Sequence, residues 1–125
     1  KIIGVDVDQA AIIDGAYGEG MTVTSPMKGL APTVKTMLSE VVAGNFANYG
    51  GKIDTLGLVS ENPEDNYVQI PMESTQWADG AFTQDDYKAL VKAMFDGTLT
   101  VSNDITKGAK DFATVIAVDD QGQIK

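Results

Sequence analysis

Apolar residues recur at helical spacing in two stretches of the chain. In residues 30–42 they stand at i, i+4, i+7, i+8, i+11 and i+12, which places them on one face of an α-helix. In residues 87–95 a similar spacing follows Thr83, a favourable N-cap residue, and Asp86, the acid of a weak capping box. Gly97 then stands where a helix commonly ends. The pattern predicts two amphipathic helices.

Short β-rich segments alternate with these two helices. The candidate strands are residues 1–5, 21–25, 53–60, 67–71, 98–101 and 113–118. Residues 10–13 could form a single helical turn. This alternation is typical of α/β proteins that have a mostly parallel sheet with flanking helices. We expect the first strand to be buried, and ligands to gather at the carboxyl ends of the strands.

The composition removes several kinds of chemistry. The 125 residues include no Cys and no His, and all nine basic residues are Lys. Disulfides, Cys/His zinc sites, His general bases and arginine fingers are therefore excluded. The formal net charge of −9 argues against a nucleic-acid backbone as partner. The sequence has no P-loop and no dinucleotide-binding fingerprint, and we expect no cofactor.

The length of the chain suits one ordinary domain. No apolar run reaches the ~18 residues that a bilayer crossing needs. The chain starts with Lys1 inside an apolar run, without an initiator Met or a leader segment. We therefore expect it to be a portion of a longer protein.

Two carboxylates follow the first candidate strand, and three interpretations of them are open. Asp6 and Asp8 could bind Mg²⁺ in a phosphoryl-transfer enzyme, although such sites usually include further acids and a glycine-rich loop. One carboxylate could instead accept hydrogen bonds from the hydroxyl groups of a polyol or a ribose. The third interpretation is an Asx turn in an ordinary loop.

A lysine and a serine follow the second candidate strand. Lys28 either donates to a ligand oxygen or is simply solvated, as most isolated lysines are. Ser25 is a nucleophile only if a base lies beside it, and the sequence has no His for that role. Ser25 and Lys28 are three residues apart, but a Ser–Lys pair is disfavoured because the intervening Pro26 leaves no recognisable Ser-x-x-Lys helix start.

Four segments of the chain resemble a known family. They are IIGVDVDQ in residues 2–9, VTSPMK in 23–28, LGL in 56–58 and FDGTLTV in 95–101. Together they are similar to the carboxy-terminal portion of the basic-membrane-protein (BMP, or PnrA-like) family, the substrate-binding lipoproteins of ABC importers. The first segment is the most specific. Pro26 and the long stretch 60–82 depart from the family pattern.

The resemblance implies a type I periplasmic-binding-protein fold, in which two α/β lobes enclose a ligand. Residues 1–125 would be a carboxy-terminal fragment, with 21–49 contributing to the first lobe and the remainder mainly to the second. The ribose-binding carboxylate would be Asp6 and the ligand-contacting lysine Lys28. Asp8 and Gln9 would support the site, and the residues that stack on the base would lie upstream.

The resemblance also implies what the parent protein does. It would bind a nucleoside, and a purine nucleoside in particular, without chemical turnover and deliver it to an ABC permease. It would be extracytoplasmic and held at the bacterial cell membrane by a lipid anchor on its amino-terminal part. Two alternatives stay open: a ligand-sensing regulatory module of the same fold, and a Mg²⁺-dependent α/β hydrolase that uses Asp6 and Asp8.

Overall fold

Two small sheets form the centre of the molecule. The computed structural model describes residues 1–122. Strand β1 (Ile2–Ile3) pairs in parallel with β2 (Thr22–Thr24), and β3 (Met27–Lys28) pairs antiparallel with β4 (Val68–Gln69). The chain therefore combines helices with small sheets, as α/β proteins do. The expected single, mostly parallel sheet is replaced in the described residues by one parallel and one antiparallel pair.

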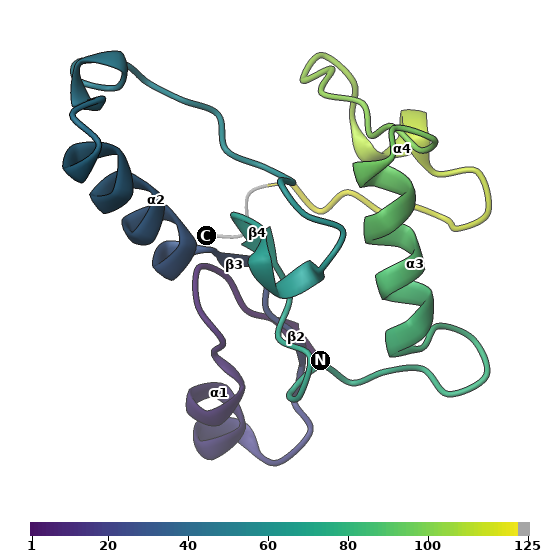
Figure 1. Cartoon of the computed structure of the whole chain (residues 1–125). Helices are drawn as coiled ribbons and strands as arrows, with labels where there is room; N and C mark the ends of the chain where they lie inside the picture. The colour runs from purple at the N-terminus through teal and green to yellow at the C-terminus, as the bar shows by residue number, and fades with distance from the viewer. Residues whose placement is uncertain (123–125) are drawn as a thin grey trace.

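In the part of the chain that the structure describes, four α-helices surround the strands. They are α1 (Ala10–Tyr17), α2 (Leu30–Val42), α3 (Gln84–Phe95) and the single turn α4 (Ala109–Phe112). Short 3₁₀ turns occupy Phe46–Asn48 (η1) and Pro63–Asp65 (η2). Both predicted amphipathic helices are confirmed, and they lie on opposite sides of the strands (Figure 1). The helical turn expected at 10–13 extends through Gly15 to the end of α1.

Three of the expected strands do not form. No strand is present at residues 53–60, 98–101 or 113–118. A β-rich sequence needs a partner strand, and here other hydrogen bonds take the backbone groups. The amide groups of Thr98 and Leu99 both donate to the Ala93 carbonyl, which closes the end of α3. The Ala113 amide likewise donates to Ala109 and closes α4.

Few side chains in the described residues are fully buried. Val91 on α3 is the one large apolar side chain there that is almost fully enclosed, at 4% exposure. The prediction of a buried first strand is wrong, since Ile3 is 64% exposed. The accessible area is 9559 Å², whereas a compact protein of 13.2 kDa exposes about 6400 Å². The fold therefore leaves a large apolar area in contact with solvent.

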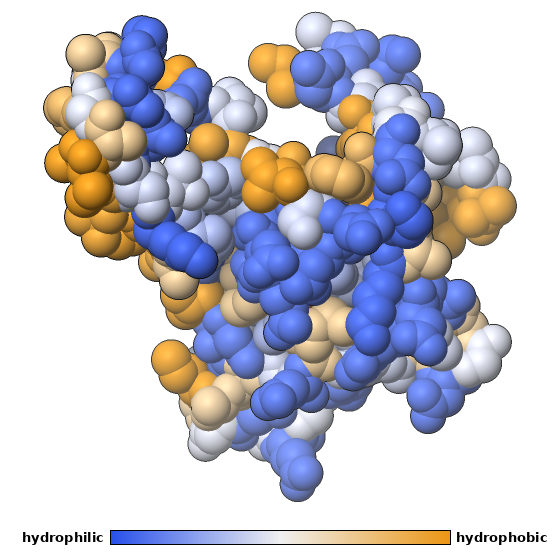
Figure 2. Space-filling model, in the orientation of Figure 1, coloured by the Kyte–Doolittle hydropathy of each residue, from blue (hydrophilic) through white to orange (hydrophobic). Residues whose placement is uncertain are grey.

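Much of that area lies on α2. Its apolar residues form the continuous stripe that the spacing predicts, but none of them is buried. Leu30, Val34 and Leu38 are each about 60% exposed. Figure 2 shows apolar side chains gathered along the outer edge of this helix. The helix is thus amphipathic without a covering partner on its apolar face.

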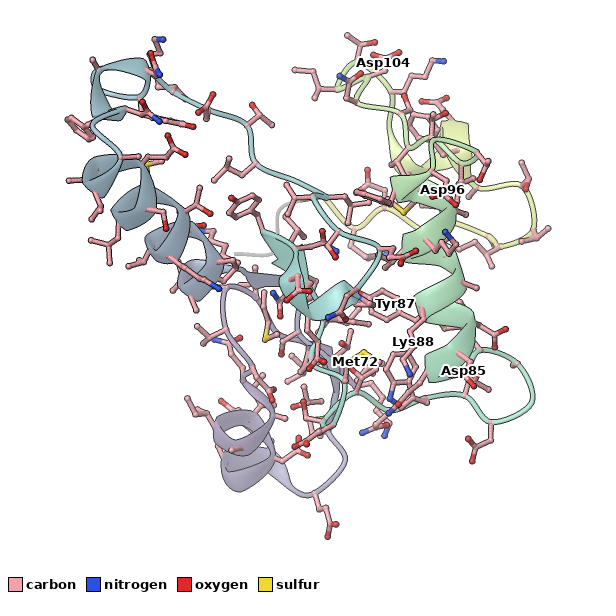
Figure 3. The ribbon with its side chains drawn as sticks, viewed as in Figure 1. Met72, Asp85, Tyr87, Lys88, Asp96 and Asp104 are labelled. Atoms are coloured by element: carbon pink, nitrogen blue, oxygen red, sulfur yellow. The ribbon has the colours of Figure 1, made fainter. Side chains whose placement is uncertain are left out.

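Helix α3 faces the strands. Tyr87 projects from it toward the strand region (Figure 3), where it lines an apolar cavity together with Val68 and Val91. The indole ring of Trp77 lies 5.8 Å from the Tyr87 ring and 6.4 Å from the Phe82 ring, measured between centroids. Burial raises the pKa of the Tyr87 phenol. This aromatic cluster packs the first turn of α3 against the segment that precedes the helix.

Candidate functional site

The candidate site begins at the residue that follows β1. The Asp6 amide donates to the Pro26 carbonyl at 2.9 Å, and the Asp6 carbonyl accepts from the Lys28 amide at 2.9 Å. These bonds make a parallel bridge between Asp6 and Met27, so the turn after β1 continues alongside the next segment. Asp6 has φ of +74°, and within residues 1–122 it is the one residue other than glycine with positive φ. Such backbone conformations concentrate at functional sites.

The structure brings the two residues of the expected site together. The Lys28 ammonium nitrogen lies 2.8 Å from an Asp6 carboxylate oxygen. Their side chains are 69% and 58% exposed. An ion pair this exposed contributes only about 0–1 kcal/mol to stability, because water and salt screen it. The pair is therefore a weak source of stability, while both charges stay accessible to a small molecule.

A cleft of about 300 Å³ opens beside this ion pair. Its walls come from the turn after β1, from β3 and β4, from η2 and from the first turn of α2. The lining residues are Asp6, Val7, Asp8, Met27, Lys28, Gly29, Leu30, Ala31, Pro32, Glu64 and Gln69. Because α2 begins at the cleft without a side-chain cap, its amino-terminal dipole adds positive potential there.

Both carboxylate oxygens of Asp8 accept hydrogen bonds from the chain. One oxygen accepts from the Ala10 amide at 3.0 Å, and the other accepts from the Ser74 hydroxyl at 2.7 Å. The first bond forms an Asx turn, which was the third interpretation of these carboxylates, and it lies at the start of α1. The second bond joins residues 66 positions apart in the sequence. Asp8 therefore holds the loop beside Asp6.

Gln9 fixes the same loop from the other side. Its side-chain oxygen accepts from the Val5 amide at 3.0 Å, and its own amide donates to the Ser25 hydroxyl at 3.2 Å. Ser25 is fully buried, so its hydroxyl is enclosed by this loop rather than free to act on a substrate. A Cβ on Gly4 would lie 2.5 Å from the Ser25 oxygen. Only glycine therefore fits at position 4 without movement of the Ser25 and Gln9 side chains.

Three residues of the site are absent from the sequence-based candidates. Glu64 and Gln69 line the cleft, and Ser74 binds Asp8, yet all three come from the segment after residue 60. Nothing local in the sequence marks them, because their roles depend on a tertiary approach. Gly4, by contrast, lies in a segment that the sequence marks, since it belongs to IIGVDVDQ.

A second carboxylate, Asp14, ties α1 to β2. It accepts hydrogen bonds from the Thr22 hydroxyl at 2.7 Å, from the Thr22 amide at 2.8 Å and from the Gly20 amide at 2.9 Å. The pKa of Asp14 is lowered, first by the bond from the Thr22 hydroxyl and then by the amide bonds. Both carboxylate oxygens of Asp14 accept hydrogen bonds from neighbouring residues of the chain. We therefore assign Asp14 a role in the fold and not in ligand binding.

No protein-family model, no curated protein and no solved structure matches the chain. Within residues 1–122, no three metal-ligating side chains of the His, Cys, Asp and Glu types come together. In the same part of the chain, no helix combines the length and apolarity that a membrane crossing requires.

Proposed function

We propose that this chain is part of a solute-binding protein and that Asp6 and Lys28 bind a nucleoside through its sugar. The observation that supports this most directly is the geometry of Asp6. A carboxylate in an uncommon backbone conformation lies at the edge of a cleft, 2.8 Å from an exposed ammonium group. The resemblance of residues 2–9 and 23–28 to the BMP family adds the class of ligand.

The chemistry of the pair suits a vicinal diol. The Asp6 carboxylate has acceptor positions for both the 2′- and 3′-hydroxyl groups of a ribose, and Lys28 can donate to a sugar oxygen. Hydrogen bonds to charged groups contribute about 1.5–3 kcal/mol each when water is excluded. The two charges pair with each other in the structure, so a ligand would exchange one exposed ion pair for several charge-assisted bonds.

The distribution of the carboxylates favours binding over metal-dependent hydrolysis. A Mg²⁺ site at this position would use Asp6 and Asp8 together. Both oxygens of Asp8 already accept hydrogen bonds, from Ala10 and from Ser74. Asp8 and Glu64 also line the cleft, but within residues 1–122 the ammonium of Lys28 pairs with Asp6. This arrangement supports recognition of a neutral polyol by one carboxylate and one cation.

In the proposed protein, two lobes close over the nucleoside and the closed form docks on an ABC permease. Ligand would shift the equilibrium between open and closed forms. The exposed apolar stripe of α2 supports the two-lobed form, because such an area is commonly covered by further protein. The proposal assigns no chemical turnover to the chain, and it places the protein outside the cytoplasm on a lipid anchor.

Calorimetric titration of the full-length two-lobed protein tests the proposal. The ligands are adenosine, guanosine, inosine and free ribose. Asp6→Ala should weaken nucleoside binding about 30- to 1000-fold, and Lys28→Met about ten- to hundredfold, because each removes charge-assisted bonds. Glu19→Gln is the matched control, since it removes an exposed carboxylate away from the cleft.

The competing outcomes are distinct. Absence of heat with every nucleoside, or affinity that is indifferent to Asp6→Ala, would remove the ligand assignment. Hydrolysis of a generic phosphoester that requires Mg²⁺, Asp6 and Asp8 would favour the hydrolase. Nucleoside binding without ligand-dependent docking on a permease would favour a sensor of the same fold.

A further inference from the structure

A second cavity, separate from the Asp6 cleft, is also lined in part by α2. It has a volume of about 360 Å³, which is within the range of small-molecule sites. Its walls come from the second turn of α2, from the segment after η1, from residues 56–59 and from the residue before β4. The lining residues are Thr33, Thr36, Met37, Tyr49, Lys52, Asp54, Leu56, Val59 and Tyr67. None of them lines the Asp6 cleft.

The wall of this cavity is held in place by a buried asparagine. Asn66 is fully buried, and its side-chain oxygen accepts from the amides of Val59 at 2.7 Å and Ser60 at 2.9 Å. Its side-chain nitrogen donates to the carbonyls of Ser60 at 3.1 Å and Asn62 at 3.0 Å. Because all these polar atoms are paired, residues 59–66 form a defined loop. The cavity is therefore largely formed before any ligand arrives.

Tyr67 is anchored to the opposite wall. Its amide donates to the Gly57 carbonyl at 3.2 Å, and its hydroxyl lies 3.0 Å from the Thr36 hydroxyl on α2. Tyr67 and Tyr49 are both half-buried. Two tyrosine rings together with Met37 make a surface that favours an aromatic group, since aromatic pairs gain about 0.5–1.5 kcal/mol beyond burial.

Two opposite charges belong to the same lining. Lys52 and Asp54 are exposed, and within residues 1–122 neither of them takes part in an ion pair. Both line the cavity, so one cationic and one anionic group stand at an otherwise mainly apolar site. A ligand that carries both charges on a short aromatic skeleton satisfies this combination best.

We propose that the cavity formed by Thr36, Met37, Tyr49, Lys52, Asp54 and Tyr67 binds an aromatic amino acid. The ring packs on the tyrosines and Met37, the carboxylate pairs with Lys52 and the ammonium pairs with Asp54. The inference is independent of the nucleoside proposal, since it uses different residues and a different ligand class. It places two small-molecule sites on successive turns of one helix.

The test is a titration of the ¹⁵N-labelled chain followed by amide chemical shifts. The three probes are L-phenylalanine, 3-phenylpropanoate, which lacks the ammonium group, and phenethylamine, which lacks the carboxylate. L-Phenylalanine should bind about two- to fivefold more tightly than either analogue, because each exposed ion pair contributes modestly. The saturable shifts should be confined to residues 33–37 and 49–67.

Variants separate the two charges. In Lys52→Met, L-phenylalanine and phenethylamine should bind equally, and in Asp54→Asn, L-phenylalanine and 3-phenylpropanoate should bind equally. Val59→Trp should abolish binding by filling the cavity, while the Val59 amide keeps its bond to Asn66. Lys35→Met and Asp6→Asn are controls that should leave all three affinities unchanged, since neither residue lines this cavity.

The same spectra show whether each variant is folded. Three equal affinities in the unmodified chain would overturn the assignment of a zwitterion. Shifts that do not saturate, or saturable binding that survives Val59→Trp, would overturn the site itself. Loss of binding in Asp6→Asn would instead place the ligand in the other cleft.

Discussion

The two long helices have similar patterns and different surroundings. Helix α3 starts with a complete capping box, in which the Asp86 amide donates to the Thr83 hydroxyl at 3.3 Å and the Thr83 amide donates to Asp86 at 2.8 Å. Helix α2 starts at Gly29 with no side-chain cap. Val91 of α3 is buried, whereas α2 buries none of its residues.

The difference shows that amphipathic spacing and burial are separate properties. Spacing and capping are local, so both helices form where the sequence predicts them. Burial depends on what else approaches, and only α3 meets the aromatic cluster around Trp77. An apolar stripe such as that of α2 therefore predicts a surface in need of a partner rather than a contact already made.

The largest expected effect comes from an attempt to give α2 the cap that it lacks. Gly29→Ser adds a favoured N-cap residue, but a Cβ at this position would lie 2.4 Å from the Asn66 carbonyl oxygen. We expect a loss of about 2–3 kcal/mol in the free energy of unfolding, because overpacking against backbone exceeds the gain from the cap. Urea denaturation followed by circular dichroism measures it.

A control substitution has the opposite sign. Gly15→Ala, inside α1 with open space around the added Cβ, should stabilise the chain by about 0.5–1 kcal/mol. A stabilising effect of Gly29→Ser would show that the segment around Asn66 gives way easily.

The second effect compares one valine on each helix. Val91→Ala should cost about 2 kcal/mol, since Val91 is 4% exposed and its loss leaves a cavity. Val34→Ala on α2 should stay within about 0.5 kcal/mol, because Val34 is 58% exposed. Equal costs, measured by the same denaturation, would mean that the stripe of α2 is covered in solution.

A third effect concerns the cap that α3 does have. Thr83→Ala removes the hydroxyl that accepts from the Asp86 amide, and it should cost about 1 kcal/mol. Thr83→Ser keeps the hydroxyl and should retain most of the stability. Matching losses in both variants would assign the effect to the methyl group of Thr83 instead of to the cap.

The smallest effect is a difference in pH dependence between the helices. Hydrogen bonds from the Thr83 side chain and amide lower the pKa of Asp86 below its ordinary value of 3.8. A lowered pKa in the folded state means that this stabilisation is present above pH about 4 and is lost as the pH falls through the folded pKa. Helix α2 has no acidic residue in its first turn. Amide chemical shifts in the first turn of α3 should therefore report a weakening of the cap on acidification, and Asp86→Asn should remove this step.

Much of the local structure could be predicted from the sequence. The range of α2, the capping box of α3 and the turns after both helices follow from residues a few positions apart. The strands were harder, because pairing depends on residues far away. Residues 53–60 have the composition of a strand, yet the Asn66 side chain takes the amides of Val59 and Ser60.

The candidate site likewise has a part that could be predicted from the sequence and a part that could not. Asp6 is marked in the sequence by its place after the first strand and Lys28 by the family resemblance, and the structure places them 2.8 Å apart. The positive φ of Asp6 and the bond between Ser74 and Asp8 could not be predicted, since both arise from the way distant segments meet. The sugar ligand and the family assignment stay predictions that the titrations address.

The uncovered stripe of α2 also has a thermal consequence. The heat capacity of unfolding reflects mainly the apolar surface that becomes hydrated, and ordinary domains show about 12–15 cal/mol/K per residue. A chain that already exposes 9559 Å² when folded has less apolar surface left to hydrate. Its heat-capacity change should fall below that range, so its stability should vary only gently with temperature and its melting transition should be broad.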